Sequence, residues 1–324
     1  MQKFEYIQPS SIKSASKYLR KKNGAAMPFA GGTDLLGLMK DNIFSPKQLV
    51  NLKKVDDLNY IKYDETEGLR IGALTKLSDI TNSEVIKNKY TALHQAASEV
   101  ATLQLRNIAT IGGNICQRPR CFYFRGEFDC IRKGGDTCFA VTGNNKYHCI
   151  VGGGPCYIVH PSDTAVALLA MDAKFKISSG NVEKVVTAKD FFVLPDTDDM
   201  KENILEDGDI LTEIILPNLS SSSISSYIKV KERETWDFAL VSIAGVFNRN
   251  GNIIKDGKIS FGGVAPAPWV EEEVNKQLEN FKVTEESISK LSGIAFKNHD
   301  ALEMNEYKVI LARNLIKKLL LNLV

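Results

Sequence analysis

The cysteines of this 324-residue chain are confined to one segment. All six lie between positions 116 and 156, at Cys116, Cys121, Cys130, Cys138, Cys149 and Cys156. A chain of this length can bury a core that needs no disulfide bridges for stability, so the clustering calls for another explanation. Thiolates select soft metals and metal–sulfur clusters, and we therefore expect several of these sulfur atoms to meet at one point.

The spacing of the cysteines leaves three kinds of site open. No two cysteines are separated by only two residues, which disfavours a zinc ribbon, a zinc knuckle and a bacterial ferredoxin motif. Disulfide bridges would require an oxidising compartment. An irregular structural zinc site and an iron–sulfur cluster held by long loops are the other two alternatives. A redox cofactor bound next to the segment would favour a [4Fe–4S] cluster, which takes four thiolates.

Composition and charge exclude several classes of partner. Hydrophobic residues make up 44% and charged residues 25% of the chain, as in ordinary globular proteins. The net charge of +2 gives no reason to expect nucleic acid. The N-terminus lacks the apolar core of a signal peptide and no run of 18 apolar residues occurs, so no membrane insertion is expected. We expect a cytoplasmic protein with reduced thiols, and export with a signal-bearing partner subunit stays open.

Two glycine-containing segments indicate a small-molecule site near the cysteines. Gly31-Gly32-Thr33-Asp34 lies between an expected strand and an expected short helix, and Thr110-Ile111-Gly112-Gly113-Asn114 directly precedes the cysteine segment. Glycine turns let backbone N–H groups converge on an anion, and a helix N-terminus adds positive potential. Neither segment is a Rossmann or P-loop motif. The pair predicts a dinucleotide whose pyrophosphate is held from two sides, against the alternative of two ordinary tight turns.

Seven segments in a fixed order carry a family resemblance. They are residues 28–40, 71–75, 104–114, 161–163, 227–229, 239–242 and 261–266. This set resembles the FAD-binding medium subunit of the molybdenum hydroxylases, the family of xanthine dehydrogenase, carbon monoxide dehydrogenase and aldehyde oxidoreductase. The resemblance covers nearly the whole chain, and its motifs are specific in combination.

The resemblance implies an α+β fold with two domains. The first is a two-part FAD-binding domain of the vanillyl-alcohol-oxidase (PCMH-like) type, and the second is a small α+β domain like the C-terminal domain of the carbon monoxide dehydrogenase flavoprotein. The expected divisions are 1–217 for the FAD-binding domain (1–57 and 58–217, with a cysteine-rich insertion at 116–157), 218–226 for a serine-rich linker and 227–324 for the C-terminal domain.

The resemblance also implies roles for individual residues. Residues 29–33 would wrap the FAD pyrophosphate, and Asp163 would bind the ribose or adenine part. Leu211 would pack against the flavin or adenine, and Lys229 would lie near the isoalloxazine ring, although an alternating strand also fits a solvent-facing lysine. The full expected cofactor-binding set is Pro28, Phe29, Ala30, Gly31, Gly32, Thr33, Asp34, Thr110, Gly113, Asn114, Asp163, Leu211 and Lys229.

The cysteine segment resembles an insertion found in two subgroups of this family. Both carry a [4Fe–4S] cluster there: the 4-hydroxybenzoyl-CoA reductase medium subunit and the bacterial aldehyde oxidoreductase subunits, of which the second is more similar. That pattern implies Cys121, Cys130, Cys138 and Cys156 as ligands. The other subgroup would use Cys149 in place of Cys130. Cys116 is interpreted as a small buried residue, and His148 and His160 as donors to the sulfur atoms or as structural histidines.

The function implied is electron transfer within a complex. FAD and a [4Fe–4S] cluster are the expected cofactors, and a molybdopterin-binding large subunit and a [2Fe–2S] small subunit are the expected partners. Electrons would pass from the [2Fe–2S] clusters to FAD and on to an external acceptor. No residue of this chain is expected to act on the organic substrate. Two alternatives are a stand-alone FAD oxidoreductase of the same fold and a zinc-stabilised binding module.

Overall fold

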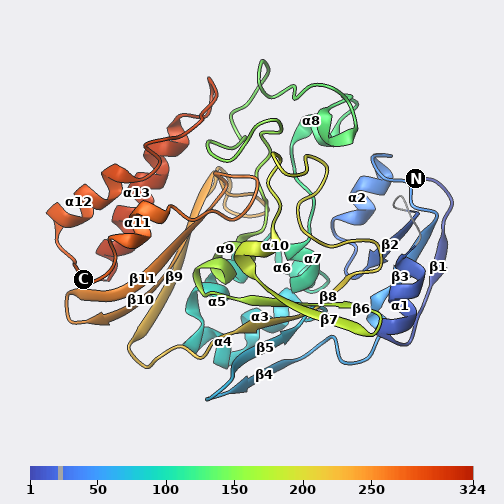
Figure 1. Cartoon of the computed structure of the whole chain (residues 1–324), viewed down its shortest axis with the longest axis horizontal. Helices are drawn as coiled ribbons and strands as arrows, with labels where there is room; N and C mark the ends of the chain where they lie inside the picture. Colours follow the sequence, from blue (N-terminus) through green and yellow to red (C-terminus); the bar gives the residue numbers. More distant parts are fainter. Residues whose placement is uncertain (21–24, 324) are drawn as a thin grey trace.

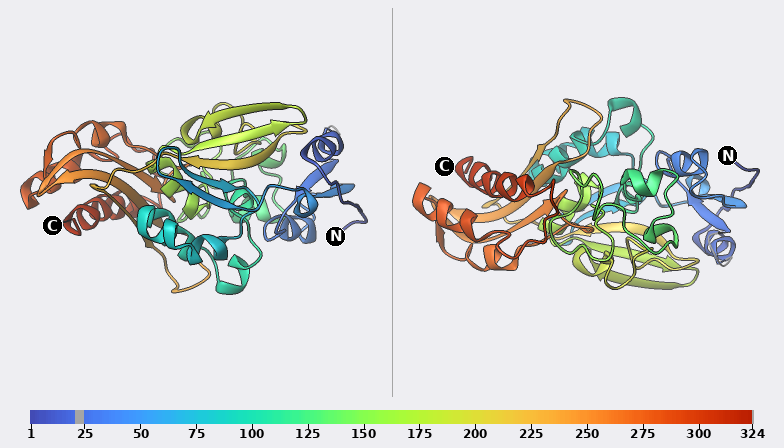
Figure 2. Two further views of the ribbon diagram at one scale, coloured as in Figure 1. Left: turned by 90° about the horizontal axis from the view of Figure 1, so that it is seen from below. Right: turned by 90° about the horizontal axis from the view of Figure 1, so that it is seen from above.

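The computed structural model describes residues 1–20 and 25–323, which contain three β-sheets (Figure 1). The N-terminal sheet and the C-terminal sheet lie at opposite ends of an elongated molecule, and the largest sheet lies between them (Figure 2). The cysteine segment forms an irregular green region at the top of Figure 1, above the middle sheet. The expected domain divisions at 57, 217 and 227 stay predictions.

The N-terminal unit is a parallel three-stranded sheet in the order β1-β3-β2. Its elements are β1 (Glu5–Ile7), α1 (Ile12–Leu19), β2 (Ala26–Phe29), α2 (Leu35–Lys40), β3 (Gln48–Asn51) and the 3-10 turn η1 (Leu52–Lys54). Ser11 begins α1 by accepting a hydrogen bond from the N–H of Ser14. The apolar face of α1, Ala15 and Leu19, packs with Val50 of β3 in a small core.

The middle sheet has five antiparallel strands in the order β4-β5-β8-β6-β7. The strands are β4 (Ile61–Asp64), β5 (Gly68–Gly72), β6 (Lys174–Ser179), β7 (Val182–Thr187) and β8 (Ile210–Leu216). The associated helices are α3 (Leu77–Asn82), α4 (Glu84–Lys89), α5 (Thr91–Ser98), α6 (Leu103–Arg106), α7 (Ile111–Ile115), α9 (Asp163–Ala170) and α10 (Ala188–Phe191). Helix α9 is buried along its whole length, so it forms the centre of the largest core.

The cysteine segment leaves the fold after α7 and returns at α9 with little regular structure, only α8 (Phe122–Arg125) and the 3-10 turn η2 (Ile131–Lys133). Its later part is bonded to the C-terminal sheet, because the N–H of Ile150 donates to the Val264 carbonyl. The buried amide of Asn305 donates to the carbonyls of His148 and Cys149. The segment is therefore tied to structure that lies far away in sequence.

The C-terminal part is an antiparallel sheet in the order β12-β11-β10-β9, packed against helices. Its elements are β9 (Ser223–Val230), β10 (Val241–Asn250), β11 (Ile253–Gly262), α11 (Glu272–Lys276), β12 (Phe281–Lys282), α12 (Glu285–Ile294) and α13 (Tyr307–Leu321). A capping box of Thr284 and Ser287 begins α12. Leu319 of α13 and Phe247 of β10 are fully buried in the core between them.

Two local expectations are corrected. The expected turn at 110–114 is the short helix α7, because Thr110 accepts a hydrogen bond from the N–H of Gly113 and closes a helical turn. The last four residues of the serine-rich linker expected at 218–226 belong to strand β9, which begins at Ser223 and pairs there with Asn248 of β10. Strand β9 lies at the edge of its sheet, and an edge strand tolerates a run of serines.

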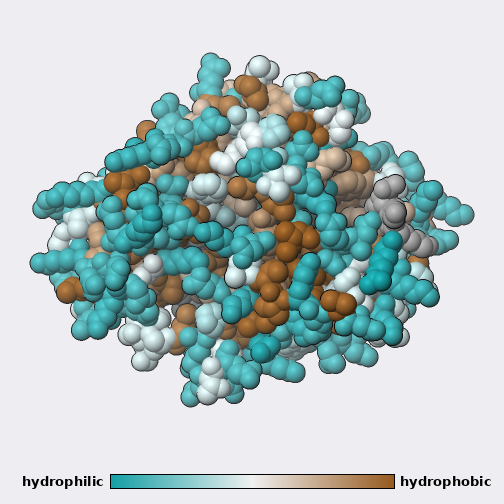
Figure 3. All heavy atoms as spheres, viewed as in Figure 1, coloured by the Kyte–Doolittle hydropathy of each residue, from teal (hydrophilic) through white to brown (hydrophobic). Residues whose placement is uncertain are grey.

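Hydrophilic side chains cover most of the face seen in Figure 3, and hydrophobic ones gather toward its middle. Among the residues that the structure describes, no helix is both long and apolar enough to cross a membrane.

Candidate functional site

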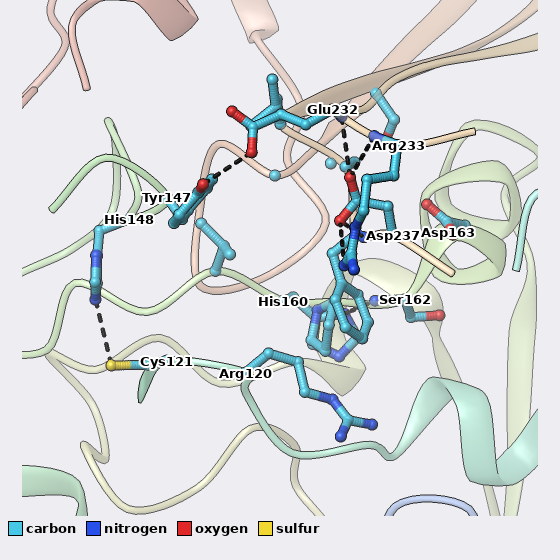
Figure 4. Close-up of a pocket in the computed structure, with 18 of the residues that line it drawn as sticks. Arg120, Cys121, Tyr147, His148, His160, Ser162, Asp163, Glu232, Arg233 and Asp237 are labelled. Carbon is cyan, nitrogen blue, oxygen red and sulfur yellow. Dashed lines mark hydrogen bonds and ion pairs between the residues drawn. The ribbon is translucent and has the colours of Figure 1, made fainter. Parts of the chain in front are cut away.

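Three adjoining cavities lie between the three sheets. The first, of about 200 Å³, is lined by both glycine segments and by Leu211 of β8. The second, of about 420 Å³, shares Thr33 and Gly113 with the first. The third, also of about 420 Å³, shares Arg120 and Asp163 with the second (Figure 4). The three cavities share wall residues, and together they are called the groove below.

The groove brings together most of the expected cofactor-binding residues. Those that line it are Pro28, Ala30, Gly31, Gly32, Thr33, Asp34, Thr110, Gly113, Asn114, Asp163 and Leu211. Phe29 and Lys229 do not line it. The ring of Phe29 lies against Tyr6, with their centroids 5.9 Å apart, and it supports the glycine segment from behind.

The first glycine segment has free backbone donors. Among the described residues, no acceptor takes the N–H of Gly31, Gly32, Thr33 or Asp34. Gly32 has a φ of +71°, in the left-handed region that favours glycine, and a Cβ at Gly31 would lie 2.3 Å from the carbonyl oxygen of Ile108. The segment can therefore approach both a ligand and its neighbouring backbone, and its donors suit an anion.

The second glycine segment has already used its donors. The N–H groups of Ile111, Gly112 and Gly113 donate to the Thr75 carbonyl, the Ala73 carbonyl and the Thr110 hydroxyl, respectively. The sequence argument that this segment offers converging N–H groups is therefore wrong for this conformation. Gly112 packs against Ala73, where a Cβ would be 2.8 Å from its carbonyl oxygen, whereas a Cβ at Gly113 would meet only Thr110. What Gly113 provides is space at the wall of the groove.

Asp163 and Lys229 form a buried ion pair. Lys229 Nζ lies 2.7 Å from the Asp163 carboxylate, and the Tyr227 hydroxyl donates to the same carboxylate at 2.6 Å. Burial raises the pKa of Asp163 above its usual value, and the Lys229 ammonium opposes that shift. The Lys229 side chain is only 1% exposed, so the solvent-facing alternative is wrong. Lys229 does not line the groove itself, but it pairs with Asp163, which does.

Asp34 connects the first glycine segment to the cysteine segment. Its carboxylate accepts hydrogen bonds from the guanidinium groups of Arg120 at 2.9 Å and Arg125 at 2.7 Å, and from the N–H of Arg118 at 2.8 Å. Asp34 was expected to contact the cofactor, and it does line the groove, but its charge is already paired by arginines of the cysteine segment. Sequence reasoning missed these arginines, since no spacing rule links residue 34 to residues 84 to 91 positions away.

A second carboxylate, which is buried, holds the cysteine segment from the other side. Glu202 lies 2.7 Å from Arg118 Nε and 3.2 Å from Arg132 Nε, and its side chain is 4% exposed. Arg132 also donates to the backbone carbonyls of Asp199 and Lys201. Charges are thus paired at both edges of the cysteine segment and restrict its path, because an unpaired charge buried there would be costly.

Four cysteines line one small enclosed cavity beside the groove. They are Cys121, Cys130, Cys138 and Cys156, the set expected from the aldehyde oxidoreductase pattern. Cys138 and Cys156 interact directly, and a hydrogen bond from the Cys156 thiol lowers the pKa of Cys138. Cys149 and Cys116 do not line this cavity. Burial raises the pKa of both of these thiols. Cys149 is fully buried, whereas Cys116 is half-buried and lines the first cavity of the groove, so its interpretation as simply a small buried residue is only partly right.

The four thiols surround a space and do not converge on one point. Within residues 1–20 and 25–323, no three His, Cys, Asp or Glu side chains are grouped closely enough to hold a single metal ion.

His148 and Cys121 form the boundary between the cysteine cavity and the groove. Both line the cysteine cavity and the third cavity of the groove. His148 Nε2 lies 3.2 Å from Cys121 Sγ, and a dashed line marks this contact in Figure 4. Burial lowers the pKa of His148 to about 4. Of the two histidines expected as donors to sulfur, His148 contacts a cysteine, whereas the ring of His160 lies against Phe192.

The loop between β9 and β10 was not expected at the site. Arg233, Asp237 and Phe238 line both the second and the third cavity. Glu232 accepts a hydrogen bond from the Tyr147 hydroxyl at 2.8 Å, which joins this loop to the cysteine segment. A polar connection between two strands carries no sequence signal of its own, so only the tertiary structure identifies these residues.

Comparison with known proteins defines the class of this chain. Residues 2–219 match the family described as the FAD binding domain in molybdopterin dehydrogenase, and residues 226–323 match the CO dehydrogenase flavoprotein C-terminal domain. The chain therefore belongs to the family of FAD-binding medium subunits of the molybdenum hydroxylases.

Individual relatives agree with this assignment. The chain is 32% identical to the aldehyde oxidoreductase FAD-binding subunit PaoB of Escherichia coli K12, over 99% of this chain and 98% of the relative. It is 25% identical to the carbon monoxide dehydrogenase medium chain of Hydrogenophaga pseudoflava, over 98% and 96%. The solved structure of carbon monoxide dehydrogenase from Hydrogenophaga pseudoflava superposes with a TM-score of 0.77 at 24% identity, covering 98% of this chain and 96% of that one.

These findings confirm the expected family, the two-domain fold class and the assignment as an oxidoreductase subunit. They also support FAD as a cofactor. The individual cofactor contacts and the cluster stay predictions.

Replacing Gly31 with alanine should weaken FAD binding. The new Cβ would overlap the backbone of Ile108 and push the glycine segment away from α6 and α7. We expect Gly31→Ala to lose about tenfold or more in FAD affinity, or about 1.4 kcal/mol. Flavin fluorescence titration of apoprotein measures this change.

Gly37→Ala is the matched control. It lies in α2, where a Cβ would meet nothing within 4 Å, so we expect unchanged FAD affinity and a gain in stability of about 0.5–1 kcal/mol. Equal FAD affinity in Gly31→Ala and the wild type would contradict the close approach inferred here.

Replacing Asp34 with asparagine should loosen the cysteine segment. The change removes the charge that pairs with Arg120 and Arg125, at a cost of about 1–2 kcal/mol because these side chains are only partly exposed. We expect faster cleavage within residues 116–157 in limited proteolysis followed by mass spectrometry. Asp41→Asn, at an exposed position at the end of α2, should leave the cleavage rate unchanged. The same cleavage rate in both variants would show that Asp34 does not hold the insertion.

Proposed function

We propose that this chain is the FAD-binding electron-transfer subunit of a molybdenum-cofactor-dependent hydroxylase or dehydrogenase, and that it holds a [4Fe–4S] cluster beside its flavin. One observation supports this most. Four cysteines, separated by up to 35 positions, line one small cavity that shares Cys121 and His148 with the groove. A sulfur-lined cavity next to a flavin groove fits a second redox centre better than it fits a structural staple.

The residues of the groove fit FAD. The free N–H groups of residues 31–34 suit the negative charge of a pyrophosphate, and Gly113 leaves room opposite them. Leu211 would pack against one ring system, and Asp163, held by Lys229, would accept hydrogen bonds from hydroxyl groups of the cofactor. When bound, FAD would supply the redox chemistry that amino-acid side chains lack, and the protein binds and orients it.

The chemistry and number of the four cysteines suit a four-iron cluster. Their cavity is only about 10 Å³, so the sulfur atoms would move apart to admit it. A [4Fe–4S] cube is held by four thiolates at separate corners, so its ligands surround it and do not meet at a point, as the four cysteines here surround their cavity. Cys121, Cys130, Cys138 and Cys156 would be the ligands. Cys149 is fully buried elsewhere, which favours Cys130 over Cys149 as the fourth ligand.

The proposed partners are a molybdopterin-binding large subunit and a [2Fe–2S] small subunit. The names of the relatives, an FAD-binding subunit and a medium chain, are those of parts of larger assemblies. Large apolar side chains are exposed near the groove, with Leu103 at 69%, Ile108 at 55% and Trp236 at 63%, and such surface is typical of interfaces. Electrons would enter from the small subunit, reduce FAD and leave to an external acceptor. The cytoplasmic location expected from the sequence stays a prediction.

Cofactor analysis of the anaerobically purified chain tests this function. We expect about one FAD, four irons and four sulfides per chain, with a visible spectrum of flavin plus iron–sulfur absorption. Protein that lacks both flavin and stoichiometric iron and sulfide would contradict the proposal. Zinc in a colourless protein would favour a binding module. Reduction of the flavin by a small organic substrate without partner chains would favour a stand-alone oxidoreductase.

Single replacement of Cys130 and of Cys149 tests the ligand set. We expect Cys130→Ser to lose the iron and sulfide, because it removes one of four thiolates, and Cys149→Ser to keep them, because Cys149 lies outside the cavity. Both cysteine side chains are buried and belong to the same segment, so each variant controls for the loss of a buried thiol in the other. Retention of the cluster in both variants, or its loss in Cys149→Ser alone, would show that this ligand set is wrong.

A further inference from the structure

The imidazole of His148 lies in the wall between the cysteine cavity and the third cavity of the groove. Its Nε2 is 3.2 Å from Cys121 Sγ, within hydrogen-bonding distance for a sulfur atom. Cys121 is the one proposed ligand that lines both cavities. The contact therefore lies at the sulfur atom that faces the groove.

The position of His148 is fixed by the surrounding structure. The backbone N–H of His148 donates to the Asn145 carbonyl at 2.9 Å, and the backbone carbonyl of His148 accepts a hydrogen bond from the Asn305 amide at 3.2 Å. The ring lies against the aromatic rings of Phe122 and Tyr123, with centroids 5.7 and 6.0 Å away. The residue is 3% exposed. A side chain held at both its backbone and its ring presents Nε2 to the sulfur in one orientation.

The direction of this hydrogen bond follows from chemistry. A cysteine that binds iron is a thiolate and can only accept a hydrogen bond, so Nε2 must carry the proton. The other ring nitrogen, Nδ1, is buried and has no partner among the described residues. A proton on Nδ1 would have no acceptor among the described residues, whereas a proton on Nε2 can be donated to the Cys121 sulfur. The tautomer with the proton on Nε2 is therefore favoured.

We propose that His148 is a positioning residue that donates an Nε2–H hydrogen bond to the Cys121 thiolate and thereby raises the reduction potential of the cluster. This inference rests on the proposed function, because it requires the cluster. One-electron reduction adds negative charge to the iron–sulfur core and its thiolates. A donor at a thiolate stabilises that added charge, which makes the cluster easier to reduce. Because Cys121 lines both cavities, the donor would act at the proposed ligand that borders the groove.

The test is a redox titration of the purified chain with its FAD and cluster, in which low-temperature EPR follows the reduced cluster. His148→Leu keeps a side chain of similar size but removes the donor, and we expect its midpoint potential to move to a more negative value. His148→Gln offers an amide N–H in place of Nε2–H, and we expect it to restore the potential toward that of the wild type.

His160→Gln is the matched control. His160 is also buried and also lines the third cavity, but it does not line the cysteine cavity. We expect the cluster in this variant to titrate at the wild-type potential. A wild-type potential in His148→Leu, or an equal negative shift in all three variants, would overturn the proposal.

A measurement on the wild type keeps the proposal testable if a variant fails to assemble its cluster. Pulsed EPR of the reduced cluster should detect a nearby proton whose hyperfine coupling disappears after exchange into D₂O, and ¹⁵N-labelled histidine should show a coupled nitrogen. Absence of both couplings would overturn the role of His148 while leaving the cluster intact. Absence of iron and sulfide in the wild type would instead overturn the proposed function, so the two failures are distinguishable.

Discussion

The arrangement of the site depends on the pairing of the Asp34 carboxylate with residues of the cysteine segment. Asp34 lies at the start of α2 and bonds three residues of the cysteine segment, Arg118, Arg120 and Arg125. Glu202 pairs with Arg118 and Arg132 on the other side. An irregular loop of this length would otherwise have a large conformational entropy, and two carboxylates, the partly buried Asp34 and the buried Glu202, restrict it at separate points. The cysteine cavity and the groove share a wall because these charges are paired.

The two glycine pairs show that similar sequence can serve different physical ends. Gly31 and Gly32 belong to a segment whose N–H groups are free, and both are needed where the backbone approaches Ile108 and where φ is positive. Gly112 and Gly113 lie in a helical turn whose N–H groups are all used within the protein. The first pair provides donors and close packing, whereas the second provides close packing and an open wall. A motif that names only the glycines cannot separate these cases.

Sequence reasoning reached the family and the fold class through the order of the motifs, which is a local property of the chain. It reached the set of cysteines that share a cavity through the resemblance to the aldehyde oxidoreductase subunits, since the spacing alone left three kinds of site open. It misjudged what depends on distant partners. The alternating strand around Lys229 fits a solvent-facing lysine until Asp163, 66 positions earlier, is seen to lie beside it. The pairing of Asp34 with Arg125 spans 91 positions and has no periodicity. The charged groups of the site were therefore visible in the sequence, but their partners were not.

The bond from Asn305 to the carbonyls of His148 and Cys149 has a consequence for how the protein is made. The wall of the cysteine cavity is completed by a residue that emerges from the ribosome long after all six cysteines have been synthesised. Until then, the cysteine segment lacks its last anchor, and its thiols are exposed to oxidation and to stray metal ions. If these cysteines hold a cluster, its insertion into the completed cavity would follow the synthesis of Asn305, and the cysteines would lack this anchor while residues 157–305 are made.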